Sequence, residues 1–283
     1  MFDKASGIIH RNTLANVLLF LLLTTGPLRG GCAAEGTKPS SPNDVSADAV
    51  DKVLSRLKQR TEQLESYQAR IEYLFVQPAP FDSTRLMKGV LYYQKVGDKS
   101  NLRLNFDSLK QDDERTQKHK EQFIFDGVWL TQIDYQLEQV NRYQQAEPNE
   151  PVNAFELARR NFPIIGFTKV EELKTEFEIE LVEGKASEPS EPVRLHLKVR
   201  PDSVYKDSYT AIDVWIDKKT DLPAKIVAVT TEADIYEIKL LKPQVNKKIA
   251  RKVFDFEIPE GFTTASEPLK NAADTEGASR ANE

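Results

Sequence analysis

The part of the chain with the composition of a folded protein begins with a segment in which apolar residues have the spacing of a helix. From Ser46 onward, apolar side chains recur every three or four residues, and charged or amide side chains fill the positions between them. The pattern predicts one amphipathic helix of about five turns, whose apolar stripe has to pack on another apolar surface. The stripe consists of Val50, Val53, Leu54, Leu57, Leu64 and Tyr67.

After Tyr67 the period of the pattern changes to two, which is typical of strands with one buried face. Asp126-Gly127 separates two such runs and predicts a two-residue hairpin turn. Most connections are too short for a helical crossover, so the sheet is predicted to be mainly antiparallel. The predicted strands cover residues 69–75, 88–95, 102–106, 123–125, 128–133, 137–143, 176–183, 193–200, 211–217, 222–230, 233–241 and 252–258.

Two short helices are predicted to interrupt these strands. Asn153 with Glu156 opens the first, and Thr168 with Glu171 forms a capping box that opens the second. Together these elements predict an α+β fold, with one large curved antiparallel sheet and helices packed on one of its faces.

Two of the predicted strands alternate most clearly between apolar and charged positions. In 193–200, Val and Leu occupy one face and four basic side chains the other; in 176–182, Glu alternates with apolar residues. Opposite charges on two solvent faces indicate that these strands are neighbours. The basic face is interpreted as a solvated surface, and a basic binding strip is the alternative. The four basic residues of this face are Arg194, His196, Lys198 and Arg200.

The amino terminus has the pattern of an export signal. Lys4 and Arg11 precede a short apolar run at 17–23, and small residues follow it. The run is too short to span a bilayer. Two kinds of processing remain open: ordinary cleavage after residue 33 or 34, or lipidation of Cys32, which follows Gly31 as in a bacterial lipoprotein signal. We therefore expect an exported, periplasmic protein, anchored in the membrane if Cys32 is lipidated.

Composition and charge restrict the chemistry. The net charge of −5 disfavours nucleic acid as a partner, and one cysteine among 283 residues excludes a disulfide framework. The histidines show no metal-ligand spacing, His119 being placed in a polar loop, and no Ser or Cys stands in a nucleophile motif. The acidic cluster at 112–114 is assigned to a solvated charge run. We expect no enzyme activity, no metal and no cofactor.

The order of motifs resembles that of the LolA/LolB-type lipoprotein carriers. The residues that carry the resemblance are LESYQA at 64–69, GVLYY at 89–93, LRLNF at 102–106, FDGVWL at 125–130, LEQV at 137–140, IDVWID at 212–217 and FDFEIPEG at 254–261. The resemblance implies an incomplete antiparallel β-barrel whose concave face is covered by helices, enclosing an apolar cavity for acyl chains. It also implies that no catalytic residue is needed.

One feature of those carriers is missing here. They place an arginine near the end of the strand with the Gly-x-Leu motif and tie it to lid movement, whereas this chain has Gln94, Lys95 and Val96 there. The nearest arginine, Arg103, belongs to the next strand. The same fold also serves a lipid-sensing envelope stress regulator. The resemblance therefore implies either acyl-chain transfer toward the outer membrane or, as the alternative, a regulatory protein-interaction module.

A carrier of this kind needs a dry apolar hollow, because burying one methylene is worth about 0.8 kcal/mol. We expect a monomer that takes acyl chains of lipoproteins or other envelope lipids from a donor membrane protein and passes them to an acceptor. The alternative is that the same side chains fill a solid core. The candidate lining residues are Leu102, Leu104, Phe106, Phe123, Phe125, Phe177, Ile179, Leu195, Leu197, Ile212, Val214 and Ile216.

The connection between the two short helices is unusually apolar. It contains Phe162, Ile164, Ile165 and Phe167 between Pro163 and Gly166. This composition suggests a lid, and a buried connection is the alternative. The predicted organisation is a signal peptide over 1–33, a flexible linker over 34–45, the half-barrel domain over 46–265 and a disordered tail over 266–283.

Overall fold

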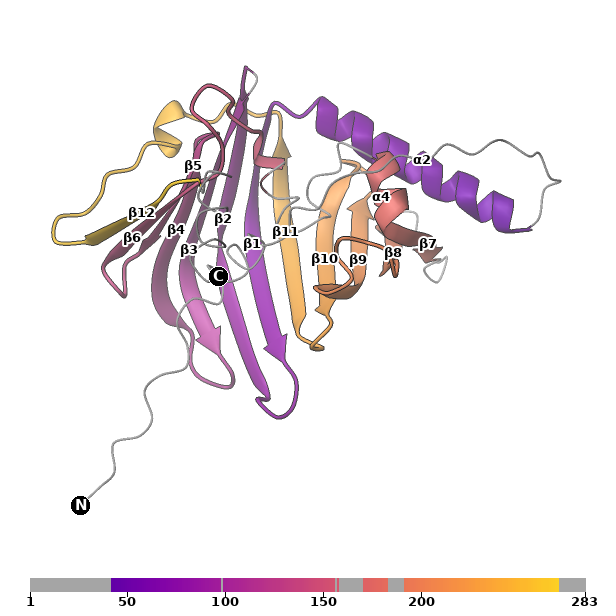
Figure 1. Ribbon diagram of the computed structural model, residues 1–283, viewed down its shortest axis with the longest axis horizontal. Helices are drawn as coiled ribbons and strands as arrows, with labels where there is room; N and C mark the ends of the chain where they lie inside the picture. The colour runs from indigo at the N-terminus through magenta and orange to yellow at the C-terminus, as the bar shows by residue number, and fades with distance from the viewer. Residues whose placement is uncertain (1–41, 98, 156, 158–169, 183–190, 270–283) are drawn as a thin grey trace, which may run out of the picture.

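The computed structural model describes residues 42–97, 99–155, 157, 170–182 and 191–269. Twelve strands form one open sheet in the order β12-β6-β5-β4-β3-β2-β1-β11-β10-β9-β8-β7. All neighbouring strands are antiparallel except β12 and β6, which run parallel. The sheet curves, and the helices lie on its concave side (Figure 1). The predicted α+β class and incomplete barrel are confirmed.

Most strands coincide with the predicted segments, and six of them, β1 to β4, β9 and β11, are longer than predicted. The strands are β1 (Ser66–Gln77), β2 (Ser83–Val96), β3 (Lys99–Gln111), β4 (Gln117–Phe125), β5 (Trp129–Asp134), β6 (Gln139–Gln144), β7 (Phe177–Val182), β8 (Val193–Val199), β9 (Tyr209–Asp217), β10 (Leu222–Thr230), β11 (Ile235–Val245) and β12 (Thr263–Glu267). The predicted turn at Asp126-Gly127 is confirmed: the Asp126 carboxylate accepts hydrogen bonds from the backbone N–H groups of Val128 and Trp129 at 2.9 and 2.8 Å.

The predicted amphipathic helix is α2 (Pro42–Glu62), which lies across the β7–β10 half of the concave face (Figure 1). Leu54 and Leu57 are completely buried. The helix ends earlier than predicted, because Leu64 lies in a turn and Tyr67 already belongs to β1. A second helix, α4 (Val170–Glu176), packs beside it, and the Lys174 ammonium lies 2.5 Å from the Asp51 carboxylate.

The basic face of β8 is neutralised rather than free. Asp213 of β9 accepts from both Arg194 and His196 at 3.0 Å, and Lys198 lies 3.7 Å from Glu178 of β7. The predicted pairing of these two strands is confirmed, with Glu178 opposite Lys198. The interpretation of this surface as a solvated face is therefore favoured over a binding strip.

The carboxyl-terminal segment differs from the prediction. The strand predicted over 252–258 is wrong: that stretch contains the 3₁₀ turn η1 (Arg251–Val253) and irregular backbone. Phe256 packs instead on the outer face of the sheet, against a small cluster of Ile124, Ile133 and Val140. The alternation of Phe254 and Phe256 was misleading, since a segment that packs across a sheet also needs apolar anchors. β12 then follows and extends to Glu267, two residues into the predicted tail.

Arg103 holds this segment in place. Its Nη1 donates to the backbone oxygens of Val253 and Asp255 at 2.9 and 2.7 Å, and its Nη2 donates to Gln122 at 3.0 Å. Burial lowers the pKa of Arg103, although the group remains a cation at any neutral pH. Arg103 therefore faces the outside of the sheet, on the side away from the helices.

His119 also differs from the prediction. It lies in β4 rather than in a polar loop, and only 8% of its surface is exposed. Its Nε2 lies 3.5 Å from the carboxylate of Glu121, which in turn accepts a 2.7 Å hydrogen bond from Gln132. The polar sequence around it hid this position, because its neighbours Lys118 and Lys120 are exposed.

Candidate functional site

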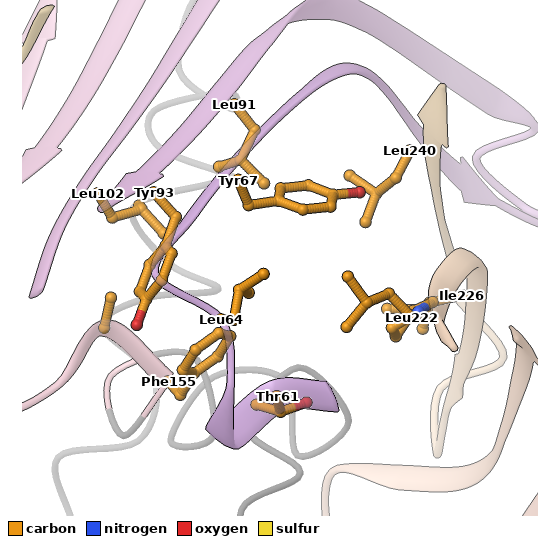
Figure 2. A pocket seen from close by; sticks show the side chains of 12 residues that line it. Thr61, Leu64, Tyr67, Leu91, Tyr93, Leu102, Phe155, Leu222, Ile226 and Leu240 are labelled. Atoms are coloured by element: carbon orange, nitrogen blue, oxygen red, sulfur yellow. The ribbon is translucent and has the colours of Figure 1, made fainter. Parts of the chain in front are cut away.

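An apolar pocket of about 80 Å³ lies where the end of α2 meets the inner face of the sheet (Figure 2). The helix supplies its last turn, five strands (β1, β2, β3, β10 and β11) supply side chains, and the segment after β6 closes one side. The pocket is lined by Thr61, Leu64, Tyr67, Leu91, Tyr93, Leu102, Ala154, Phe155, Leu222, Pro223, Ile226 and Leu240.

Strand pairing places these side chains on one surface. Tyr67 is opposite Tyr93, and Tyr93 is opposite Leu102, so the three face the same side of β1, β2 and β3. The Tyr93 and Phe155 rings lie 4.8 Å apart between centroids. Directly opposed residues of antiparallel strands share a face, so the pairing register brings these side chains into one wall.

The few polar groups of the pocket wall either form hydrogen bonds within the protein or stay uncharged. Thr61 Oγ1 donates to the backbone oxygen of Leu57 at 2.9 Å. Burial raises the pKa of Tyr67, and the Asp217 charge raises it further. Burial also raises the pKa of Tyr93, although hydrogen bonding with Asn153 and Ser100 acts in the opposite direction. At neutral pH the pocket therefore presents an uncharged, mainly hydrocarbon surface.

Of the twelve residues predicted to line a cavity, Leu102 lies in this pocket. The other eleven belong to the core cluster of the inner face or pack against it. Nine are buried, while Leu104 and Ile179 are half-buried. Their predicted role in binding an acyl chain stays a prediction. The buried nine are Phe106, Phe123, Phe125, Phe177, Leu195, Leu197, Ile212, Val214 and Ile216.

The remaining predicted site residues lie outside the described part of the chain. These are the lid residues Phe162, Ile164, Ile165 and Phe167 and the lipidation candidate Cys32. The pocket also contains residues that the prediction missed. Tyr67 was assigned to the helix stripe, and Leu91 and Tyr93 appeared only within the GVLYY motif. Their common signal, an inward position next to the helix end, becomes visible only when the strands are paired.

The volume of the pocket sets what it holds in this conformation. An apolar cavity of about 150 Å³ admits benzene, so 80 Å³ accommodates only the end of a hydrocarbon chain. Among the described residues, no group of three His, Cys, Asp or Glu side chains is arranged to hold a metal ion. Within the same residues, no helix has the length and apolar composition needed to cross a membrane.

Comparison with known proteins gives matches to solved structures alone. No protein-family model matches the chain. No curated protein matches it significantly. A LolA superfamily protein from Nitrosomonas europaea, NE2245, is 10% identical, with 73% of this chain and 97% of that chain covered and a TM-score of 0.31. This likeness is one of fold alone.

Two further solved structures match similar shares of this chain. An uncharacterised conserved protein from Thermus thermophilus is 10% identical, covers 77% of this chain and 99% of its own, and has a TM-score of 0.46. A chain of the MucA/MucB complex from Pseudomonas aeruginosa is 15% identical, with coverages of 74% and 61% and a TM-score of 0.42. At these identities the similarity concerns the fold and carries no conclusion about ligands.

Proposed function

We propose that this protein binds acyl chains of lipoproteins or other envelope lipids and transfers them across the periplasm toward the outer membrane, without catalysing a reaction. The observation that supports this proposal is the apolar pocket at the junction of α2 and the sheet, whose wall is almost entirely hydrocarbon. A surface of this kind favours an apolar ligand, because it offers no charge or open hydrogen-bonding group to a polar one.

The size of the pocket indicates how binding would proceed. A volume of 80 Å³ holds about three methylene-sized groups, worth roughly 2 kcal/mol of hydrophobic burial. Micromolar affinity requires about 8 kcal/mol, equivalent to roughly ten methylenes. The pocket is therefore proposed as the entry point, and a longer chain would enter between α2 and the sheet as the helix lifts.

The contacts of α2 are compatible with such a movement. Among the described residues, its polar links to the sheet side include two: Arg56 lies 3.5 Å from Asp221, and Arg60 Nε donates to the Thr220 backbone oxygen at 3.0 Å. A third polar link, the Asp51–Lys174 ion pair, joins it to α4. The Arg56–Asp221 pair is exposed, and such pairs contribute little to stability. The helix is attached to the sheet mainly through its apolar side. An acyl chain offers the sheet an equivalent apolar surface when the helix lifts.

Solvent extraction tests the proposal. The protein is purified from a bacterial periplasm, extracted with chloroform and methanol, and the extract is analysed by mass spectrometry. Acyl lipid recovered in near-stoichiometric amount supports acyl-chain binding. Absence of extracted lipid, together with no uptake of a fluorescent fatty acid by the delipidated protein, contradicts it.

The cellular location follows from the predicted leader. We propose that the protein is exported, and that lipidation of Cys32 would make it an anchored acceptor rather than a soluble shuttle. The intact mass of the mature protein distinguishes these cases, because diacylation of Cys32 adds a mass that simple cleavage after residue 33 or 34 does not.

A second candidate is a regulatory or protein-interaction module of the envelope. The filled interior of the described sheet favours it, since Phe106, Phe125 and Phe177 are at most 1% exposed and leave the inner face packed. Under this proposal the extracted protein yields no lipid, and affinity for a protein partner is unaffected by delipidation.

A further inference from the structure

A second pocket, of about 170 Å³, lies at the opposite end of the inner face of β1, β2 and β3. Tyr67 lines the first pocket and Phe75 the second; these residues are eight positions apart on β1, which corresponds to roughly 26 Å. The wall of the second pocket is mixed, about half polar and half apolar, whereas that of the first is almost entirely apolar. It is lined by Phe75, Gln77, Ser83, Thr84, Arg85, Leu109 and Gln111.

Arg85 is the one charged side chain among these lining residues. In the strand register it lies opposite Phe75 on one side and Gln111 on the other, so it projects from the inner face. Its Nε is buried and has no hydrogen-bond partner. Among the described residues, none forms an ion pair with it. This nitrogen is removed from water without receiving an acceptor in return, although Arg85 as a whole is only half-buried, and an unpaired buried donor is unfavourable unless a ligand supplies an acceptor.

Tyr73 presents a second unused donor on the same face. It lies in the cross-strand pair next to that of Arg85, opposite Met87, and it is 3% exposed. Its hydroxyl group also has no hydrogen-bond partner. Burial raises the pKa of Tyr73 and Tyr236 adds to this effect, whereas the Arg85 charge lowers it. The arginine is therefore close enough to act on the phenol, and both donors lack an acceptor.

We propose that this pocket binds the oxyanion of an amphiphile, a carboxylate or a phosphate, with Arg85 as its main donor. The inference rests on the proposed acyl-chain binding and adds a separate subsite for the charged end and first methylenes of a ligand, because roughly 26 Å along β1 is farther than one ten-carbon chain reaches. A planar guanidinium group matches both oxyanions by paired hydrogen bonds. Phe75 and Leu109 provide apolar surface for the first methylenes, and 170 Å³ holds about five or six water-sized groups.

Calorimetric titration of the delipidated protein tests this assignment, with decanoate, decyl phosphate, decanol and inorganic phosphate as separate ligands. The Arg85→Gln variant is expected to bind decanoate and decyl phosphate about tenfold more weakly or worse, and decanol unchanged. Arg70→Gln is the matched control, because Arg70 is exposed on the outer face of β1 and should alter none of these affinities.

The thermal midpoint of Arg85→Gln should equal or exceed that of the wild type, since the substitution removes an unpaired buried donor. If the variant does not fold, Arg85→Lys replaces it; this change keeps the charge but loses the paired geometry, and it should weaken decanoate more than decanol.

Three results would overturn the assignment. If Arg85→Gln leaves the affinity for decanoate unchanged, or weakens decanoate and decanol equally, the anion subsite is wrong while acyl-chain binding stands. If inorganic phosphate binds as tightly as decyl phosphate, the site takes a free anion rather than an amphiphile. If the wild type binds neither decanoate nor decanol, the proposed function fails and the subsite with it.

Discussion

Gly89 lies at the tightest contact between two central strands, and its replacement by alanine should strongly destabilise the fold. β3 is bulged at Asp107, which has no partner in β2, where the pairing shifts between Lys88 and Gly89. A Cβ atom added to Gly89 would lie 1.9 Å from the backbone oxygen of Asn105 and 2.9 Å from the Cα of Phe106. Both obstacles are backbone atoms, so no side chain can rotate to make room.

The expected cost follows from this geometry. Real Cβ atoms essentially never approach within 3.0 Å of another heavy atom, so β2 and β3 would have to separate by about 1 Å. Overpacking in a core costs about 1–3 kcal/mol, and a backbone obstacle places this case at the upper end. For a domain of this size, 3 kcal/mol corresponds to a thermal midpoint lower by roughly 6–12 °C.

Differential scanning calorimetry of purified Gly89→Ala measures this shift. Gly97→Ala is the control, because Gly97 has a φ of +60° but no atom within 4 Å of the added Cβ. Its cost comes from the backbone conformation alone and should be about 1 kcal/mol. The reasoning is refuted if Gly89→Ala melts within 2 °C of the wild type, or no lower than Gly97→Ala.

Three further predictions address other parts of the molecule. Arg103→Ala should release the segment over 251–267, seen as faster amide hydrogen exchange there and unchanged exchange in β9; equal protection in both proteins contradicts the anchoring role. Ile226→Trp should fill the apolar pocket and abolish uptake of a fluorescent fatty acid, whereas Val227→Trp on the opposite face should not. Burial raises the pKa of Tyr209 to about 12. The contribution of the neutral Tyr209 phenol to the free energy of unfolding is therefore complete below pH 10, and it falls by about 3 kcal/mol as the pH rises through 12. Urea unfolding at pH 9 to 12 should show this loss of stability. The Tyr209→Phe variant should show a smaller loss.

This chain lacks the arginine that the LolA/LolB-type carriers place near the end of the strand with the Gly-x-Leu motif. Lys95, at the end of β2, lies 3.7 Å from Glu65 in the turn after α2, so this position links the strand to the helix end through an exposed ion pair. Arg103, the nearest arginine in the sequence, acts on the outer face instead. Lys95 is therefore engaged near the helix end, and Arg103 on the opposite face of the sheet.

Local patterns determined a large part of this fold. The three-to-four spacing of Leu54 and Leu57 identified α2, and period-two alternation identified most strands, because both periods follow from backbone geometry within a few residues. The Asp126-Gly127 turn was equally local, since a carboxylate and a positive φ are sufficient to form it. The one wrong strand, over 252–258, arose because apolar alternation does not reveal whether the backbone finds a pairing partner.

The sites were decided by the tertiary structure. β1 pairs with β11, about 170 residues further along the chain, and this pairing joins Tyr67 to Leu240 and Ile226 around the apolar pocket. Alternation marks Phe106 and Leu102 identically as inward-facing, yet one is packed in the core and the other borders a hollow. Whether Arg85 has an acceptor is likewise set by what the other strands bring near it. Periodicity specifies the direction of a side chain, whereas the space and the partners around it depend on contacts between distant segments.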